Sequence, residues 1–148
     1  MTDDEKAAWA EIEFLQSVDD LVNYGPSLNV RICGLPITER GVLIVAAQID
    51  TGAAGSCISL KLAGELGLPI IGTGEIHQPG LDPIPAPYFK ARIAIRSGVG
   101  WYNLDLVLAG LAILDPPHNV LIGRDILAHG RISVDFLTGV TIWRIKAN

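Results

Sequence analysis

The segment Ile49-Asp50-Thr51-Gly52-Ala53-Ala54-Gly55-Ser56 guides the interpretation of this sequence, because it places an acid directly after an apolar run. Residues 42–49 are nearly all apolar, so we predict a strand buried on both faces. A carboxyl group at the end of such a strand is costly to bury unless it has partners or a function. Gly52 leaves room for another backbone to approach, and Thr51 and Ser56 can hold the loop by local hydrogen bonds. An ordinary strand-to-loop turn with an exposed aspartate is the alternative on this segment alone.

The composition favours one domain built from short strands. The chain has 148 residues, 49% of them hydrophobic and only 6% aromatic, with Gly 16 and Pro 9. This combination is typical of strands joined by tight turns rather than of a helix bundle. A net charge of -5 argues against nucleic acid as the main partner, because binding phosphates requires a basic face. Cys33 and Cys57 have no metal-ligand spacing and are too few for a disulfide framework.

Targeting and membrane signals are not found in the sequence. The first residues are acidic and lack the basic region followed by an apolar stretch that marks a secretory signal. The longest apolar run, residues 42–47, is too short to span a bilayer. We therefore expect a cytoplasmic protein with no membrane partner.

Residues 2–23 are expected to form a helix, which Gly25-Pro26 would end. This prediction divides the chain into an N-terminal helical extension, residues 1–25, and a main domain, residues 26–148. The helical interpretation depends on apolar side chains that recur at the spacing of one helix face, at Ala8, Ile12, Leu15 and Val22.

The remainder of the chain has the period of two that is typical of strands. A short helix is expected after Ser59, which can cap it, with Gly67 beyond its end. The fold class is therefore mainly β, a closed or partly closed β-barrel with short helices. The expected strands, besides residues 42–49, are residues 28–32, 92–96, 102–108, 120–122, 131–136 and 140–145.

A second specific segment is Asn119-Val120-Leu121-Ile122-Gly123-Arg124-Asp125-Ile126-Leu127, about seventy residues after Asp50. Together the two segments resemble the retropepsin-like family of aspartic proteases. That family has an Asp-Thr/Ser-Gly-Ala loop and, later, an apolar-apolar-Gly-Arg-Asn/Asp stretch threaded behind it. The resemblance covers roughly residues 28–145 in layout, and the short helix after Ser59 resembles cellular and bacterial members more than viral ones.

The resemblance implies a role for each matching residue. Asp50 would be the catalytic acid, Thr51 would brace the partner's loop and Gly52 would offer its carbonyl to the substrate. The region from Gly72 to Tyr88 would be a flap over the active site, with a surface loop as the alternative. The expected substrate-binding residues are Ala53, Gln78, Pro79, Gly80 and Leu81. The residues expected to support the loop or brace the dimer are Ser56, Ile122, Gly123 and Arg124.

The implied reaction is hydrolysis of a peptide bond in a polypeptide substrate by an activated water. Two carboxyl groups share one proton in this chemistry. The chain has one Asp-Thr-Gly triplet, so the pair would require a symmetric homodimer. We expect no cofactor and no metal, because His77, His118 and His129 lack ligand spacing.

A protease-fold module that binds or dimerises without cleaving is the alternative interpretation. Viral members of the family often have further acids after Asp-Thr-Gly-Ala. Here Ala54 and Gly55 occupy those positions, so Arg124 needs another acceptor.

Overall fold

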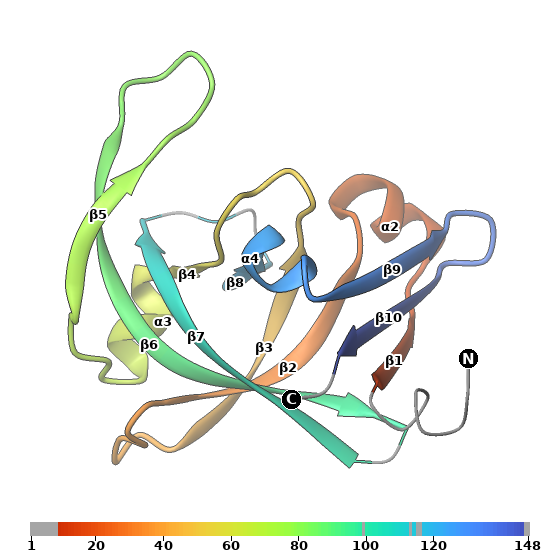
Figure 1. Ribbon diagram of the computed structural model, residues 1–148, viewed down its shortest axis with the longest axis horizontal. Coiled ribbons are helices and arrows are strands. Elements are labelled where there is room, and N and C mark those ends of the chain that lie inside the picture. The colour runs from red at the N-terminus through yellow and green to blue at the C-terminus, as the bar shows by residue number, and fades with distance from the viewer. Residues whose placement is uncertain (1–8, 99, 113, 115–116, 147–148) are drawn as a thin grey trace.

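The computed structural model describes residues 9–98, 100–112, 114 and 117–146, which form a β-barrel with short helices and a projecting hairpin (Figure 1). The helices are α2 (Val18–Tyr24), α3 (Leu60–Glu65) and α4 (Arg124–Leu127). The strands are β1 (Trp9–Leu15), β2 (Ser27–Gly34), β3 (Val42–Ile49), β4 (Cys57–Ser59), β5 (Gly72–Ile76), β6 (Ile84–Ser97), β7 (Gly100–Leu111), β8 (Val120–Ile122), β9 (Gly130–Asp135) and β10 (Val140–Lys146).

Six strands close the barrel in the order β2-β3-β8-β4-β7-β6, because β6 also pairs with β2. Strand β5 pairs with the first part of β6 and extends the sheet beyond the barrel. Alternate side chains point inward and pack one core, as the two-residue period predicts. The expected β-barrel is therefore confirmed. Fully buried residues of that core include Val30, Ile32, Ile58, Ile93, Ile95, Leu108 and Ile122.

The short helix predicted after Ser59 is confirmed as α3. The Ser59 hydroxyl accepts a hydrogen bond from the Leu62 amide at 3.1 Å, which caps the helix start. Gly67 follows the helix with a φ of 64°, a conformation that favours glycine. Among the described residues, no helix has the length and apolar character needed to cross a membrane.

A smaller sheet in the order β1-β10-β9 packs against the barrel, and its central strand contributes the fully buried Trp143 to the core. The helix predicted over residues 2–23 is not observed where β1 lies. Residues 1–8 lie outside the described residues, and residues 9–15 form a strand antiparallel to β10. Within the described part of the predicted helix, residues 9–23, only residues of α2 are helical, and the Ser17 hydroxyl accepts from the Asp20 amide at 3.1 Å.

The helical prediction was wrong over residues 9–15 because it followed the wrong period. It placed Ile12 and Leu15 on one face, whereas Ile12 is 1% exposed and Leu15 is 73% exposed. Ile12 alternates with the exposed Glu11 and Glu13, which is a strand pattern. Pairing with β10, where Ile12 lies opposite Trp143, decides between the two periods.

Strand β3 forms where predicted, but it is not buried on both faces. Its second half is covered, with Ala47 and Ile49 in the core. On the outer face of its first half, Val42 is 54% exposed and Ile44 is 71% exposed. An apolar run alone does not show whether a second layer covers the outside of a barrel, and here none covers these two side chains.

The strand assignment of residues 9–15 can be tested by truncating each apolar side chain. Ile12→Ala should lower the free energy of unfolding by about 2–5 kcal/mol, because it leaves a cavity in the core. Leu15→Ala is the matched control and should change it by less than about 0.5 kcal/mol. Urea denaturation of both variants measures these changes. Similar losses for the two variants would contradict the strand, because a helix with both side chains on its buried face would lose both.

Candidate active site

The loop from Asp50 to Ser56 has to cross over the end of another strand. It joins β3 to β4, and β8 lies between those two strands in the sheet. Strand β8 runs parallel to β3, with Ile122 opposite Ile49. The Asp50 amide donates to the Ile122 carbonyl at 2.9 Å, so the pairing continues to the acid itself. The position of Asp50 is therefore fixed by backbone hydrogen bonds.

Gly123 lies directly under this loop, where only a glycine fits. A Cβ atom built there would lie 2.6 Å from the Gly55 carbonyl oxygen and 2.9 Å from that of Ala53. These partners are backbone atoms, which cannot move aside without moving the loop. The next two amides then join the loop, since Arg124 donates to the Ala53 carbonyl at 2.8 Å and Asp125 to that of Ala54 at 3.2 Å.

A buried serine connects the loop with the residues after β8. The Ser56 hydroxyl donates to the Asp125 carboxylate at 2.7 Å and accepts from the Gly123 amide at 3.0 Å. The Ser56 amide donates to the second carboxylate oxygen at 3.1 Å. Asp125 was not among the predicted site residues, although it belongs to the Gly-Arg-Asn/Asp stretch. Its position in that motif was the signal that could have identified it.

Arg124 binds a carbonyl of its own chain. Its guanidinium Nη1 donates to the Thr51 carbonyl at 2.9 Å, across 73 positions in the sequence. The Thr51 carbonyl is therefore a hydrogen-bond acceptor for Arg124, which the side chains of Ala54 and Gly55 cannot be. The Thr51 side chain itself is exposed.

The half-buried Asp50 presents its carboxylate to a cleft of about 720 Å³. One carboxylate oxygen accepts from the Gly52 amide at 2.8 Å, and a Cβ at Gly52 would lie 3.1 Å from that oxygen. The Asp50 carbonyl accepts from the Ala53 amide at 3.2 Å, which closes a tight turn. The loop therefore orients the acid while leaving it open to the cleft.

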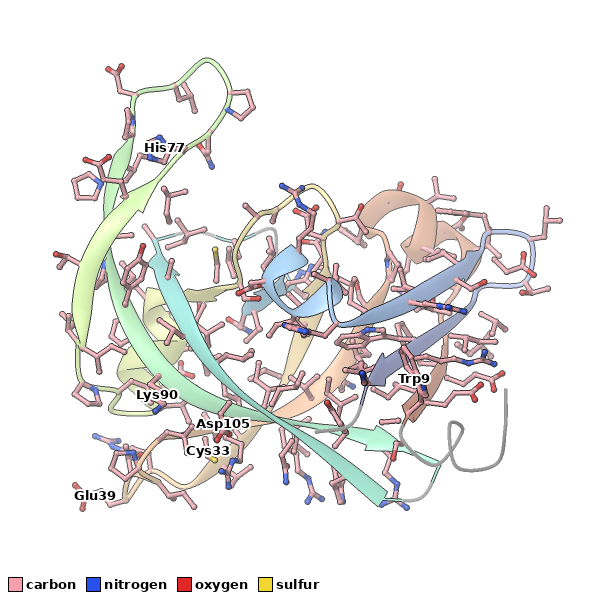
Figure 2. All side chains as sticks on the ribbon, viewed as in Figure 1. Trp9, Cys33, Glu39, His77, Lys90 and Asp105 are labelled. Atoms are coloured by element: carbon pink, nitrogen blue, oxygen red, sulfur yellow. The ribbon has the colours of Figure 1, made fainter. Side chains whose placement is uncertain are left out.

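The hairpin that projects from the barrel in Figures 1 and 2 contributes residues to the other wall of the cleft. It pairs β5 with the start of β6, from Gly72 opposite Tyr88 to Ile76 opposite Ile84. At its tip the Leu81 amide donates to the Gln78 carbonyl at 3.1 Å, and Gly80 has a φ of 74°. Proline followed by such a glycine is typical of a type II turn. Residues 78–81 therefore form the tip of the hairpin.

The structure brings together some of the predicted flap residues and not others. Gln78 and Pro79 line the cleft with Asp50 and Ala53, whereas Gly80 and Leu81 do not line it. Ile76, His77 and Tyr88 line it as well; they belong to the predicted flap region but were not among the expected substrate-binding residues. A side chain at Gly74 would overlap the Tyr88 hydroxyl, so Gly74 lets this ring lie across the hairpin.

Cys57 lines the same cleft in an acidic environment. Burial, with the carboxylates of Asp125 and Asp50, raises the pKa of the Cys57 thiol to about 11. The thiol is therefore neutral near pH 7 and poorly suited to act as a nucleophile. Within the described residues, no three His, Cys, Asp or Glu side chains are grouped as a metal site would require.

Comparison with known proteins identifies the fold. No family model matches the chain, and no curated protein matches it significantly. The chain is similar in structure to a retropepsin-like aspartic protease from Rickettsia conorii, with a TM-score of 0.55, 17% identity, and coverage of 95% of this chain and 94% of that one. The fold is retropepsin-like.

Two further structures have lower TM-scores. The EIAV protease in complex with the inhibitor HBY-793 gives 0.38 at 19% identity, covering 70% of this chain and 85% of that one. The retroviral protease-like domain of Ddi1 from Leishmania major gives 0.39 at 15% identity, covering 73% and 80%.

The role of Ser56 in holding the loop can be tested by Ser56→Ala. The change leaves the Gly123 amide and the Asp125 carboxylate short of a partner, so the free energy of unfolding should fall by about 1–3 kcal/mol. Ser133→Ala, on the exposed face of β9, is the control and should cost less than about 0.5 kcal/mol. Thermal or urea unfolding measures both. A loss for Ser56→Ala no larger than for the control would show that the hydroxyl does not support the loop.

The raised pKa of Cys57 predicts slow alkylation. A pKa of about 11 in place of the ordinary value of 9.0 makes the reactive thiolate about 100-fold rarer at pH 8. Iodoacetamide should therefore modify Cys57 about 100-fold more slowly than a cysteine in a short peptide, and the rate should rise with pH up to about 11. Mass spectrometry can follow this residue separately from Cys33. In urea the reaction should reach the peptide rate, and a peptide-like rate in the folded protein would refute the shift.

Proposed function

We propose that this protein is an aspartic endopeptidase whose active site forms between two copies of the chain, each contributing Asp50. The observation that carries the proposal is the carboxylate of Asp50, which a loop held by hydrogen bonds presents to a cleft that the hairpin covers from the other side. The similar structure from Rickettsia conorii is named as an aspartic protease, which supports this chemistry. One Asp-Thr-Gly triplet in the chain supports a shared site.

The mechanism is general acid–base catalysis without a covalent intermediate. Two carboxylates held close together cannot both ionise, so the Asp50 pair shares one proton. The ionised Asp50 takes a proton from a bound water, which attacks the scissile carbonyl carbon. The protonated Asp50 donates its proton to the carbonyl oxygen as the tetrahedral intermediate forms.

The substrate in this proposal is an extended polypeptide that lies between the hairpin and the Asp50 loop. Backbone recognition by strand addition suits such a cleft, and in this proposal the Gly52 carbonyl accepts a hydrogen bond from the substrate backbone. The exposed Thr51 is available to contact the partner's loop, while Arg124 braces its own. Apolar side chains for substrate contacts line the cleft at Ile76, Val107, Ala109, Leu111 and Leu121.

A peptide-binding module that dimerises without cleaving is the second candidate. Ala54 and Gly55 favour it, because neither offers a charge that could hold substrate backbone beside the catalytic loop. The two candidates share the cleft and differ only in turnover, so activity measurements separate them.

The shared site is tested by joining two copies of the chain with a flexible linker and placing Asp50→Asn in one copy only. Positioned acid–base groups contribute about 10²–10⁴-fold each, so cleavage should fall by that factor if both Asp50 residues serve one site. If each copy had its own site, half of the activity would survive. Hydrolysis of a fluorescence-quenched peptide library at low protein concentration measures this.

Two controls make the result decisive. Asp19→Asn in one copy removes an exposed carboxylate on α2 and should leave the tethered activity unchanged. Dilution excludes exchange between tethered molecules, which could rebuild an intact pair. Retention of about half the rate after Asp50→Asn would refute an active site shared by two Asp50 residues. Absence of any cleavage by the unmodified protein would favour the binding module.

A further inference from the structure

The outer surface of β2, β3, β6 and β7 combines arginines with exposed apolar side chains. We name it the arginine–tryptophan face. It surrounds a hollow of about 450 Å³ whose floor includes Cys33 and Ala94. In Figure 2, Cys33 and Asp105 mark this part of the barrel, at the end opposite the hairpin that carries His77. Its defining residues are Arg31, Arg92, Arg96, Trp101, Val42 and Ile44.

The strand register makes this face continuous. Arg31 lies opposite Ile44 on one side and opposite Ala94 on the other. Ala94 is small, so the Arg31 side chain extends over it to Trp101, which projects from β7 beyond Arg96. Two residues further along β2, Cys33 lies between Val42 of β3 and Arg92 of β6. Residues two apart on one strand share a face, so these side chains form one surface.

Two of the three arginines lie against the Trp101 ring, and neither has an acid partner among the described residues. The Arg31 guanidinium carbon lies 3.9 Å from the centre of the Trp101 ring, and that of Arg96 lies at 5.6 Å. Stacking on an indole holds a guanidinium while leaving its N–H donors at the edge available. Arg92 differs, because it donates to Asp105 at 2.7 and 3.1 Å. Within the described part of the chain, no carboxylate pairs with Arg31 or Arg96.

The charge of this face is opposite to that of the whole chain. The chain carries a net charge of -5, whereas this face has three arginines and one adjoining carboxylate, Asp105. Solvated arginines alone would be an ordinary surface. Here they adjoin Val42 and Ile44, more than half exposed, and Trp101, which is 41% exposed. Tryptophan and arginine around an exposed apolar patch are the residues that dominate binding in protein interfaces.

We propose that the arginine–tryptophan face binds an acidic segment of another polypeptide. Two carboxylates of that segment pair with the free edges of Arg31 and Arg96, and one apolar side chain sits in the hollow between Ile44 and Trp101. The acidic occupant follows from two guanidinium groups that no described carboxylate pairs with, and the apolar anchor follows from the exposed side chains between them. A concave hollow suits a side chain better than a flat lipid surface, and the acidic remainder of the chain would repel an anionic membrane.

This proposal does not depend on cleavage, because the face lies outside the cleft that Asp50 lines. Binding is therefore measured on the full chain with Asp50→Asn, which keeps the probe intact. The probe is a fluorescein-labelled peptide of eight residues, Glu-Glu-Leu-Glu-Glu-Phe-Glu-Glu, followed by fluorescence anisotropy. The same peptide with glutamine at every glutamate is the control probe. Only the acidic peptide should bind, and added salt should weaken its binding.

Variants locate the site on the surface. Arg31→Gln and Arg96→Gln should each weaken binding about tenfold, because each removes a charge-assisted hydrogen bond to the peptide. Trp101→Ala removes both the apolar contact and the stack, and should weaken it further. Arg131→Gln is the matched control, an exposed arginine on β9 outside this face, and should bind as the parent does. Circular dichroism verifies that each variant is folded.

Several outcomes would overturn the proposal. Equal affinity of the parent and the Arg31→Gln/Arg96→Gln double variant would show that the peptide does not bind here, and equal binding of the glutamine peptide would show that acids are not recognised. Binding of phosphatidylserine vesicles through Arg31 and Arg96 without peptide binding would assign the face to a membrane. Concentration-dependent association of the chain with itself, lost in the double variant, would assign it to a second copy.

Discussion

The close approach of the Gly123 backbone to the loop between β3 and β4 is the constraint on which the site depends. Because β8 lies between those strands, the loop has to pass over the end of β8. A side chain at position 123 would collide with the carbonyls of Ala53 and Gly55. With glycine there, the amides of Arg124 and Asp125 can join the loop, and Asp50 is fixed relative to the barrel. The acid is thus positioned mainly by backbone geometry.

The two walls of the cleft differ in how they are supported. The Asp50 loop is joined to its own chain by Ser56, Asp125 and Arg124, besides the backbone contacts below it. The hairpin is held at its outer edge by one pairing, between β5 and β6, and by Tyr88 across Gly74. An Asp50 loop with many hydrogen bonds and a hairpin with few suit a site that has to admit an extended chain and still keep its acid in place.

Features that depend on neighbours in the sequence were predictable, and those that depend on distant contacts were not. The Pro79-Gly80 turn and the cap at Ser59 follow from local chemistry, and the barrel strands follow from their period. The strand that contains Ile12 could not be predicted in this way, because only pairing with β10 distinguishes it from a helix. The role of Asp125 was also missed, since its partner Ser56 lies 69 positions away. The motif containing Asp125 was visible, but its hydrogen bonds were not.

The pairing of β1 with β10 affects how the protein can fold during synthesis. Residues 9–15 leave the ribosome well before their partners, residues 140–146, which are made about 130 residues later. Until then β1 lacks the strand with which it pairs, whereas the six barrel strands are already complete by residue 122. Closing so long a chain segment is slow, and an unpaired apolar edge is open to association with other chains meanwhile. While the chain is incomplete, its unpaired strand edge is therefore at β1 rather than in the barrel.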